Sequence, residues 1–463
     1  MTGRPSSSSS TPPPTCCRGR ERSSTSTATC SSASRSDRQA GRRGIVNGAG
    51  ISPPPPPSAW IAPVVAILVL QTMAAFLTRV MPTIAPALFA EFGWKDSFVG
   101  YAVAATTAGS MLVLLFGAET VRRVGSIRSM QLTLGLGALG MLLLLAPLPV
   151  VAMLASAVMG LAHGVATPAG SDILQRFTPR RRRNLVFSIK QAGVPLGGVL
   201  AGAMLPFIVD HAGWRSALAV AAGMVACFAA SAFLLQGYSD RTDAGEEKRI
   251  RRPGRFARLM AQPIDALASL SSEASLWRLS MAGALLATAQ SCWLAFSVAF
   301  LVSVIGLPLT VAGFVFAVMQ ASGVVGRILL GWISDRVGSG IAIMQVAALA
   351  SAVTMALLAL VDRQWPVWAL TLLAAAGGLS ASSWNGVQIA EIAARSPPPL
   401  VGLTAAGSTI LIFVSNILAP ALFTLFVTFT GRYDLAFAIV ALVNLASLPC
   451  LFGLSRSAEA AKI

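Results

Sequence analysis

Apolar stretches of about 20 residues recur along this chain between Trp60 and Leu454, and they constrain its fold more than any other feature. A helix of that length crosses the hydrocarbon core of a bilayer. Hydrophobic residues make up 55% of the 463 residues and charged residues only 11%, which is too little charge to cover a soluble protein. The pattern therefore predicts an all-α integral membrane protein and argues against a soluble enzyme.

The stretches divide into twelve predicted membrane spans, six on each side of a charged segment. Length and hydropathy place them at residues 59–88, 97–117, 129–147, 149–174, 185–208, 216–236, 276–304, 309–332, 340–361, 366–391, 400–429 and 434–454. The expected domains are a six-helix bundle at 59–236, a cytoplasmic linker at 237–273, a second bundle at 274–455 and a short tail at 456–463.

The segment 1–58 differs in composition, being rich in Ser, Thr, Pro and Arg and ending in the run 53–57 of five prolines. Such a segment has too little apolar surface to fold, so it is predicted to be disordered. An equally supported interpretation is that translation starts downstream, at Val46, and that the preceding residues do not belong to the protein. We assign this segment no function under either interpretation.

The net charge of +17 is concentrated outside the predicted spans. A basic chain can bind nucleic acid, but here most Arg and Lys residues lie in three places. These are the connections that follow even-numbered spans, which we call the even-numbered connections, the linker, and the segment 1–58. Basic connections on one side of a membrane are an orientation signal. We therefore expect a protein of a bacterial inner membrane, with these connections and both termini in the cytoplasm and with no nucleic acid partner. We also expect it to be a monomer.

The cysteine and histidine positions do not support a metal site or a cofactor. Zinc sites need clustered ligands, whereas the two histidines, His163 and His211, are far apart in the sequence. Cys227, Cys292 and Cys450 each stand alone in an apolar stretch. No nucleophile is recognisably paired with a base, so we expect a protein without cofactor and without enzymatic activity.

An internal repeat relates the two sets of six spans. Arg-Val-Gly-Ser at 123–126 recurs at 336–339, at a shift of 213. Later in each half, Gly160-Leu161 matches Gly378-Leu379 at a shift of 218. The halves are therefore related in parallel, with a small insertion in the second. Such architectures bind a solute near the membrane midplane, between the halves, and rock around it.

Residues 331–338, Gly-Trp-Ile-Ser-Asp-Arg-Val-Gly, resemble the G-x-x-x-D-R-x-G loop of the major facilitator superfamily. The resemblance covers residues 60–455 and implies two six-helix bundles that expose a central site alternately to each side. In the first-half copy, Arg122 stands at the Asp position and Ala118 at the first Gly position. The gating role of this loop is therefore expected at the second copy.

Asp335 and Arg336 are the gating candidates in that loop, and Gly331 and Gly338 are expected to let helix ends approach closely. Asp335 can contact a facing helix N-terminus or Arg327, two turns earlier. The alternative is that Asp335 and Arg336 only cap helices and set topology.

A second gating group is predicted from charged residues near the cytoplasmic ends of the spans. Asp172 and Glu391 occupy nearly equivalent positions of the repeat, and Lys190 could pair with either. The alternative role for this group is proton coupling.

Arg79 is the main candidate for substrate binding, because an ionisable residue inside a membrane is a functional candidate by default. Residues 76–93 around it resemble span one of organophosphate antiporters and sugar-acid symporters, in which an arginine binds the anion of the substrate. The repeat-related position holds Cys292, so the paired second arginine of the antiporters is missing, which favours a singly charged carboxylate. The alternative is an arginine that snorkels to the periplasmic interface.

Other polar residues in the predicted spans are candidates for solute contacts through amide, indole and imidazole groups. They are His163, Gln290, Trp293, Trp384, Asn385, Gln388 and Asn416. For each of them, packing with hydrogen bonds between helices is the competing explanation. Residues 193–198, Gly-Val-Pro-Leu-Gly-Gly, partly resemble a motif of antiporters, and helix packing is again the alternative.

The preferred hypothesis is a secondary transporter of a small organic anion, working as a proton-driven symporter. A drug efflux antiporter is the first alternative, although the predicted spans lack the deep carboxylate that lipophilic cations need. A non-transporting sensor with the same fold is the second.

Overall fold

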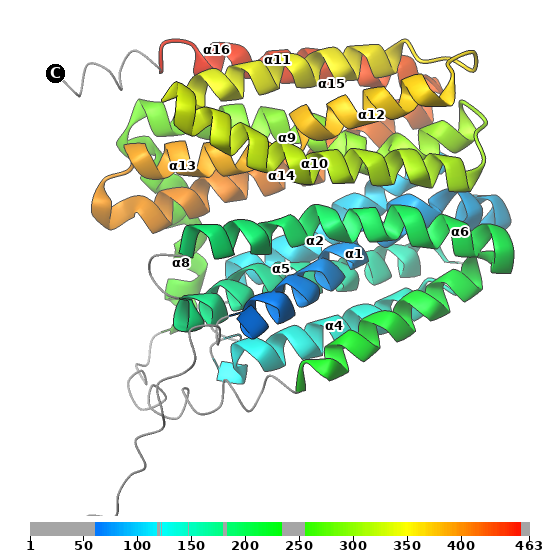
Figure 1. Ribbon diagram of the computed structural model, residues 1–463, viewed down its shortest axis with the longest axis horizontal. Helices are drawn as coiled ribbons and strands as arrows, with labels where there is room; N and C mark the ends of the chain where they lie inside the picture. The colour runs from blue at the N-terminus through cyan, green and yellow to red at the C-terminus, as the bar shows by residue number, and fades with distance from the viewer. Residues whose placement is uncertain are drawn as a thin grey trace, which may run out of the picture. The chain divides into compact units, whose positions relative to one another are not determined.

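The computed structural model describes residues 61–117, 121, 123–146, 148–178, 183–233 and 255–454, and helices without strands make up this part of the chain (Figure 1). The described helices are α1 (Ile61–Phe92), α2 (Val99–Phe116), α4 (Ser126–Leu143), α5 (Pro149–Phe177), α6 (Arg183–Ser231), α8 (Arg255–Ser269), α9 (Ala274–Ser303), α10 (Leu309–Val337), α11 (Gly340–Ala359), α12 (Val367–Ala381), α13 (Asn385–Arg395), α14 (Val401–Thr430), α15 (Tyr433–Leu445) and α16 (Ser447–Leu451). Three short 3₁₀ turns, Asp96–Phe98, Leu270–Ser272 and Pro398–Leu400, lie between them.

Ten of the described segments are long and apolar enough to cross a membrane. One of them contains two predicted spans, because α6 continues through Gly213, whose φ of 81° breaks the helical path. The third predicted span coincides with α4, which is 18 residues long. The described helices therefore account for all twelve predicted spans, and the all-α membrane fold is confirmed.

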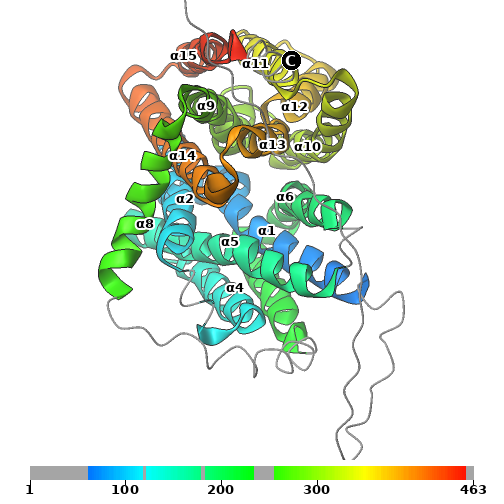
Figure 2. The same ribbon diagram turned by 90° about the vertical axis from the view of Figure 1, so that its left-hand side faces the viewer.

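Successive spans run in opposite directions, so the connections gather at two ends of the bundle (Figures 1 and 2). We call the end that carries α8 and Gly338 the linker end. The far end carries Gly93, Gly213, Gly306 and Gly431, each with a positive φ where a span begins or ends.

The internal repeat is visible in the helix packing. Gly160 of α5 lies so close to α2 that an added Cβ would collide with the backbone oxygen of Thr106. Gly378 of α12 lies in the same way against the backbone oxygen of Met319 in α10. The two glycines are related by the shift of 218, and the two residues they contact are related by the shift of 213. The two halves therefore share one packing arrangement.

The contacts between the halves follow the same symmetry. A Cβ added to Gly100 of α2 would meet the backbone oxygen of Pro420 in α14 at 2.5 Å. A Cβ added to Gly313 of α10 would meet the backbone oxygen of Gly202 in α6 at 2.5 Å. Each half therefore contributes one glycine and one partner helix to two equivalent seams, which we call the far-end seams.

The sequence did not predict α8, which lies within the charged segment 237–273. Its last turns pack on α14, where Gly407 leaves room for the backbone oxygen of Ala266 and Leu270 is fully buried. The tenth predicted span is also divided, because the helix is interrupted between α12 and α13 at Ser382.

Replacing Gly160 with leucine is expected to destabilise the fold by about 3 kcal/mol, because the collision at this position is with backbone and not with a flexible side chain. Thermal unfolding and the yield of monodisperse protein in detergent measure the effect. Gly135→Leu is the matched control, since nothing lies within 4 Å of the added Cβ there. Equal unfolding temperatures for the two variants would contradict the packing described for α5 and α2.

Candidate functional site

Arg79 lies in the middle of α1, which is buried at nearly every position from Leu70 to Pro86. Its side chain is mostly buried, and its Nε has no hydrogen-bond partner. The guanidinium interacts electrostatically with Arg327 of α10 and with His163 of α5. It therefore faces the interior of the protein, and it does not snorkel outward along a lipid-exposed surface.

His163 of α5 is mostly buried, and its Nδ1 has no hydrogen-bond partner. The imidazole lies within electrostatic range of Arg79, Lys190 and Arg327. Gly164, the next residue, packs against the backbone of Ser110, so α5 is held firmly against α2 at this depth.

Lys190 of α6 is 1% exposed. Its Nζ donates hydrogen bonds to the backbone oxygen of Thr167 at 2.6 Å and to Ser171 Oγ at 2.7 Å, both in α5. Lys190 therefore does not form the predicted pair with Asp172 or Glu391, and its hydrogen bonds go to two neutral oxygens instead.

Arg327 joins the halves. Its Nε donates to the backbone oxygen of Ser382 at 3.2 Å, and its Nη1 donates to the backbone oxygen of Gln191 in α6, also at 3.2 Å. The expected contact between Arg327 and Asp335 is not formed, because Asp335 is exposed and the guanidinium of Arg327 turns inward.

Arg79, His163, Lys190 and Arg327 form what we call the basic cluster. They come from α1, α5, α6 and α10, and none of them forms an ion pair with a carboxylate among the residues that the structure describes. Groups of like charge repel one another strongly at low dielectric when no opposite charge is present. The cluster is therefore electrostatically complementary to an anion.

Several predicted amide and indole groups also remain without hydrogen-bond partners. Trp293 Nε1, Asn385 Oδ1 and Asn416 Oδ1 are buried atoms of this kind, and Trp293 packs against Gly377 of α12. Gln290 is also buried, in the same helix as Trp293. These groups have hydrogen-bonding capacity left for a solute.

Two predicted solute contacts are used within the protein instead. Trp384 is fully buried, and its Nε1 donates to the backbone oxygen of Ala381 at 2.9 Å. Gln388 Nε2 donates to the backbone oxygen of Leu279 and to Ser408 Oγ, both at 3.3 Å.

Several buried amides were not predicted from the sequence, and two of them lie on helices that carry the basic cluster. Gln71 of α1 has both side-chain polar atoms unpartnered, and Gln320 of α10 has an unpartnered Nε2. They pack on Gly193 and Gly198 of α6, respectively. The detectable signal was an amide inside a predicted span, the criterion that selected Asn416.

The glycine-rich segment of α6 serves helix packing. Gly197 lies against the backbone of α1, where an added Cβ would meet the backbone oxygen of Thr72 at 2.6 Å. On the other side, Gly202 reaches α10 at Gly313. The packing explanation of residues 193–198 therefore accounts for these glycines.

The G-x-x-x-D-R-x-G loop, the predicted gating motif, is exposed at the linker end. Arg336 stacks over the ring of Trp332 at 4.2 Å and, like Asp335, is exposed. Gly338 has a φ of 70° and ends α10, whereas no atom lies within 4 Å of a Cβ added to Gly331. The expected close approach of helices at Gly331 is therefore wrong. Ala118 and Arg122 lie outside the described residues.

Asp172 and Glu391 occupy matching places in the two halves. Asp172 accepts a hydrogen bond of 2.7 Å from Ser126 Oγ, at the N-terminus of α4. Glu391 lies beside Gly340, at the N-terminus of α11, and forms an ion pair with Arg395. A carboxylate near a helix N-terminus is stabilised by the helix dipole.

Polar contacts close both seams at the far end. Asp210 of α6 accepts hydrogen bonds from the backbone N of Thr310 at 3.3 Å and from its Oγ1 at 2.8 Å. At the other seam, Thr424 Oγ1 donates to the backbone oxygen of Ser97 at 2.6 Å, and the hydroxyls of Ser97 and Thr428 are 3.0 Å apart. The halves are thus fastened together at the end opposite the linker.

The family model of the Major Facilitator Superfamily matches residues 65–390. The chain belongs to this superfamily. Ten of its described segments are long and apolar enough to cross a membrane, and the relatives found among curated proteins carry transporter names.

Among curated proteins, an uncharacterized MFS-type transporter of Mycobacterium tuberculosis is 27% identical over 290 residues, 63% of this chain and 61% of that protein. A probable chloroplastic anion transporter of Oryza sativa is 26% identical over 82% of this chain and 75% of its own length. A gallate transporter of Pseudomonas putida is 24% identical over 60% of this chain and 66% of its own length. The chain thus spans about three fifths of the mycobacterial relative that it matches.

Solved structures show the same fold. A bacterial homolog of the human lysosomal transporter Spinster, in an inward-facing and occupied conformation, aligns with a TM-score of 0.63 at 14% identity. The alignment covers 85% of this chain and 96% of that structure.

Proposed function

We propose that this protein is a secondary active transporter of a small organic anion that carries a carboxylate group. The basic cluster is the observation that supports this proposal most strongly. Four side chains that can carry positive charge converge in the interior without a carboxylate partner among the described residues. An incoming anion offsets their mutual repulsion and therefore binds there favourably.

The cluster divides unequally between the two halves, which we propose to be bodies that move as units. Arg79, His163 and Lys190 belong to residues 59–236, and Arg327 belongs to residues 274–455. An anion held by Arg79 and Arg327 touches both bodies at once. Binding is thereby coupled to the rocking motion expected of this architecture, in which a central site opens to each side alternately.

A carboxylate fits the cluster better than a phosphate monoester. A guanidinium engages either a carboxylate or a phosphate through two parallel hydrogen bonds, so the preference for a carboxylate rests on the residue at the repeat-related position and on the relatives. The repeat-related partner of Arg79 is Cys292, which is fully buried, so the second arginine of the antiporters is missing at that position, and the cluster's other arginine, Arg327, comes from α10 instead. The names of an anion transporter and a gallate transporter among the relatives support the same class of solute.

We further propose that transport is driven by protons as a symport, in a bacterial inner membrane with the linker end in the cytoplasm. The concentration of basic residues in the even-numbered connections supports this orientation. The far-end seams then form the periplasmic gate, and Asp335, Arg336, Asp172 and Glu391 belong to the cytoplasmic gate.

The decisive experiment is uptake into liposomes that contain the purified protein. A radiolabelled library of monocarboxylates, dicarboxylates, sugar phosphates and lipophilic cations is tested with and without an inward proton gradient. We expect at least one monocarboxylate to accumulate above protein-free liposomes, and the proton gradient to increase its accumulation. Uptake restricted to phosphate esters or to cations would contradict the proposed substrate class. Carboxylate uptake that ignores the gradient would contradict the symport alone.

A further inference from the structure

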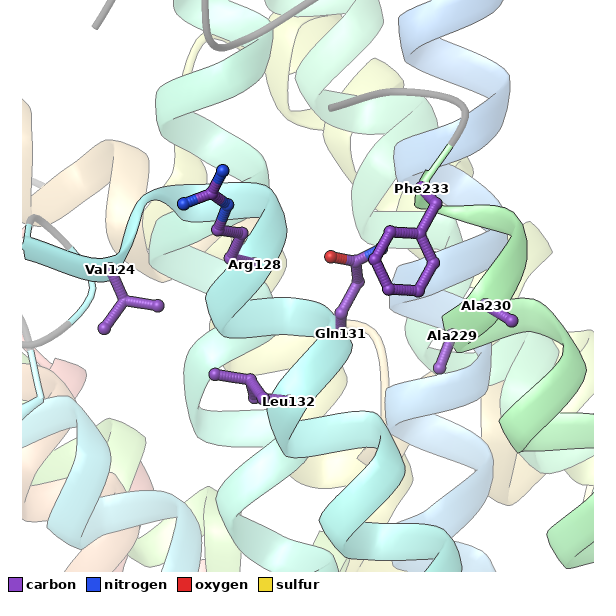
Figure 3. A pocket seen from close by; sticks show the side chains of 7 residues that line it. All are labelled: Val124, Arg128, Gln131, Leu132, Ala229, Ala230 and Phe233. Carbon is purple, nitrogen blue, oxygen red and sulfur yellow. The ribbon is translucent and has the colours of Figure 1, made fainter. Parts of the chain in front are cut away.

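A groove lies between α4 and α6 at the linker end, away from the basic cluster (Figure 3). Its volume is about 550 Å³, and it is lined by Val124, Arg128, Gln131, Leu132, Ala229, Ala230 and Phe233. Arg128 and Gln131 supply the polar lining from α4, and Phe233 lies just beyond the last residue of α6, Ser231 (Figure 3). One side of the groove is thus basic and polar, and the rest is apolar.

The groove opens onto an exposed apolar surface. Leu132 is 65% exposed and Phe233 is 64% exposed, although both are large apolar side chains. Further along α4, Leu136 and Leu139 continue the same exposed stripe at helical spacing. In a membrane transporter, such a stripe contacts acyl chains.

The charge at the groove lies at the first turn of α4, and the end of a helix that crosses a bilayer lies near the lipid headgroups. Arg128 is exposed and belongs to the first turn of α4, which begins at Ser126. Asp172 reaches the same helix end through Ser126 but does not line the groove. A guanidinium at this depth, above an apolar stripe, matches a headgroup phosphate that is followed by an acyl chain.

The other half of the protein shows what this seam looks like when it is filled. The sequence shifts of 213 and 218 relate Arg128, Gln131, Ala230 and Phe233 to Ile341, Met344, Leu448 and Leu451. Those four residues pack into one apolar core cluster, in which Ile341, Met344 and Leu451 are buried. In the first half, the polar Arg128 and Gln131 and the smaller Ala230 replace three of these apolar residues, and the groove lies beside them.

We propose that the groove between α4 and α6 is a binding site for an anionic phospholipid. Arg128 binds the headgroup phosphate, and one acyl chain lies between Phe233 and the stripe formed by Leu132, Leu136 and Leu139. The site is separate from the proposed solute site and does not depend on the identity of the transported anion.

Native mass spectrometry of the detergent-purified protein tests this proposal, with phosphatidylglycerol and phosphatidylcholine titrated separately. We expect the wild type to bind phosphatidylglycerol about fivefold more tightly than phosphatidylcholine, as one well-placed basic side chain allows. Arg128→Gln removes this preference. Ala230→Trp, at an exposed position, fills the groove and weakens the binding of both lipids.

Two variants serve as matched controls. Arg336→Gln removes an exposed arginine from the linker end of the other half, and Ala226→Trp adds the same bulk one turn from Ala230, outside the groove lining. Both are expected to retain the wild-type lipid preference. Unchanged binding of phosphatidylglycerol by both Arg128→Gln and Ala230→Trp would overturn the proposal, as would equal affinity of the wild type for the two lipids.

Discussion

Replacing Arg79 with glutamine is expected to lower carboxylate uptake by about a hundredfold or more. Charge-assisted hydrogen bonds contribute about 1.5–3 kcal/mol each, and about 1.4 kcal/mol corresponds to a factor of ten in affinity. Glutamine keeps a similar length and polarity but loses both the charge and the fork. Initial rates of uptake into liposomes, measured at several substrate concentrations, give the size of the loss.

Lysine at the same position separates charge from geometry. Arg79→Lys keeps the charge and loses the planar fork, so we expect uptake between those of the wild type and Arg79→Gln. Arg363→Gln is the matched control, because Arg363 is an exposed arginine that donates to the backbone oxygen of Val304 far from the basic cluster. If Arg79→Gln transported as well as Arg363→Gln, the assignment of the anion to Arg79 would fail, whereas transport itself would stand.

Replacing Gly313 with leucine is expected to reduce uptake to the background of protein-free liposomes. The added side chain would collide with Pro206 and with the backbone oxygen of Gly202, both in the opposite half. Because the collision lies between the halves, each half can still fold, but the far-end seam cannot close. A transporter that cannot close one end cannot complete the alternating cycle.

Three further measurements make this expectation specific. Labelling of Ser97→Cys, at the other seam, by a membrane-impermeant maleimide is expected to be faster when Gly313→Leu holds the far end open. The equivalent variant Gly100→Leu should also lose uptake, because it collides with Pro420. Gly135→Leu in α4 has open space around the added side chain, belongs to neither proposed gate, and should transport normally. Wild-type uptake by both seam variants would show that these contacts take no part in gating.

Much of the fold could be predicted from the sequence, because long apolar stretches identify helices that can span a membrane. The repeat was recognisable from residues 123–126 and 336–339, and the structure shows its physical meaning in the paired glycine contacts. The helix α8 was missed because its apolar residues are interspersed with arginines, so a search for continuous apolar runs passes over it. A search at helical spacing would have found Phe256, Leu259, Met260 and Leu267 on one side.

Less of the candidate site could be predicted, because sequence spacing shows which residues share a helix face but not which helices meet. Arg327 and Asp335 are two turns apart, which suggested that they interact, yet the structure turns Arg327 toward Arg79 and Gln191. Lys190 was assigned to the gate because it lies near a span end. Its place beside His163 depends on how α6 packs on α5, which no pattern in α6 alone reveals.

The paired glycine contacts at the far end have an evolutionary consequence. The duplicated scaffold supplies the same seam twice, but the basic cluster is not duplicated: among the described residues, three of its members lie in the first half and one lies in the second. Selection for a different solute can therefore change positions such as Arg79 and its repeat-related counterpart Cys292 without disturbing the far-end seams. Proteins of this kind can therefore diverge in the solute that they bind while the glycine contacts of the far-end seams stay the same.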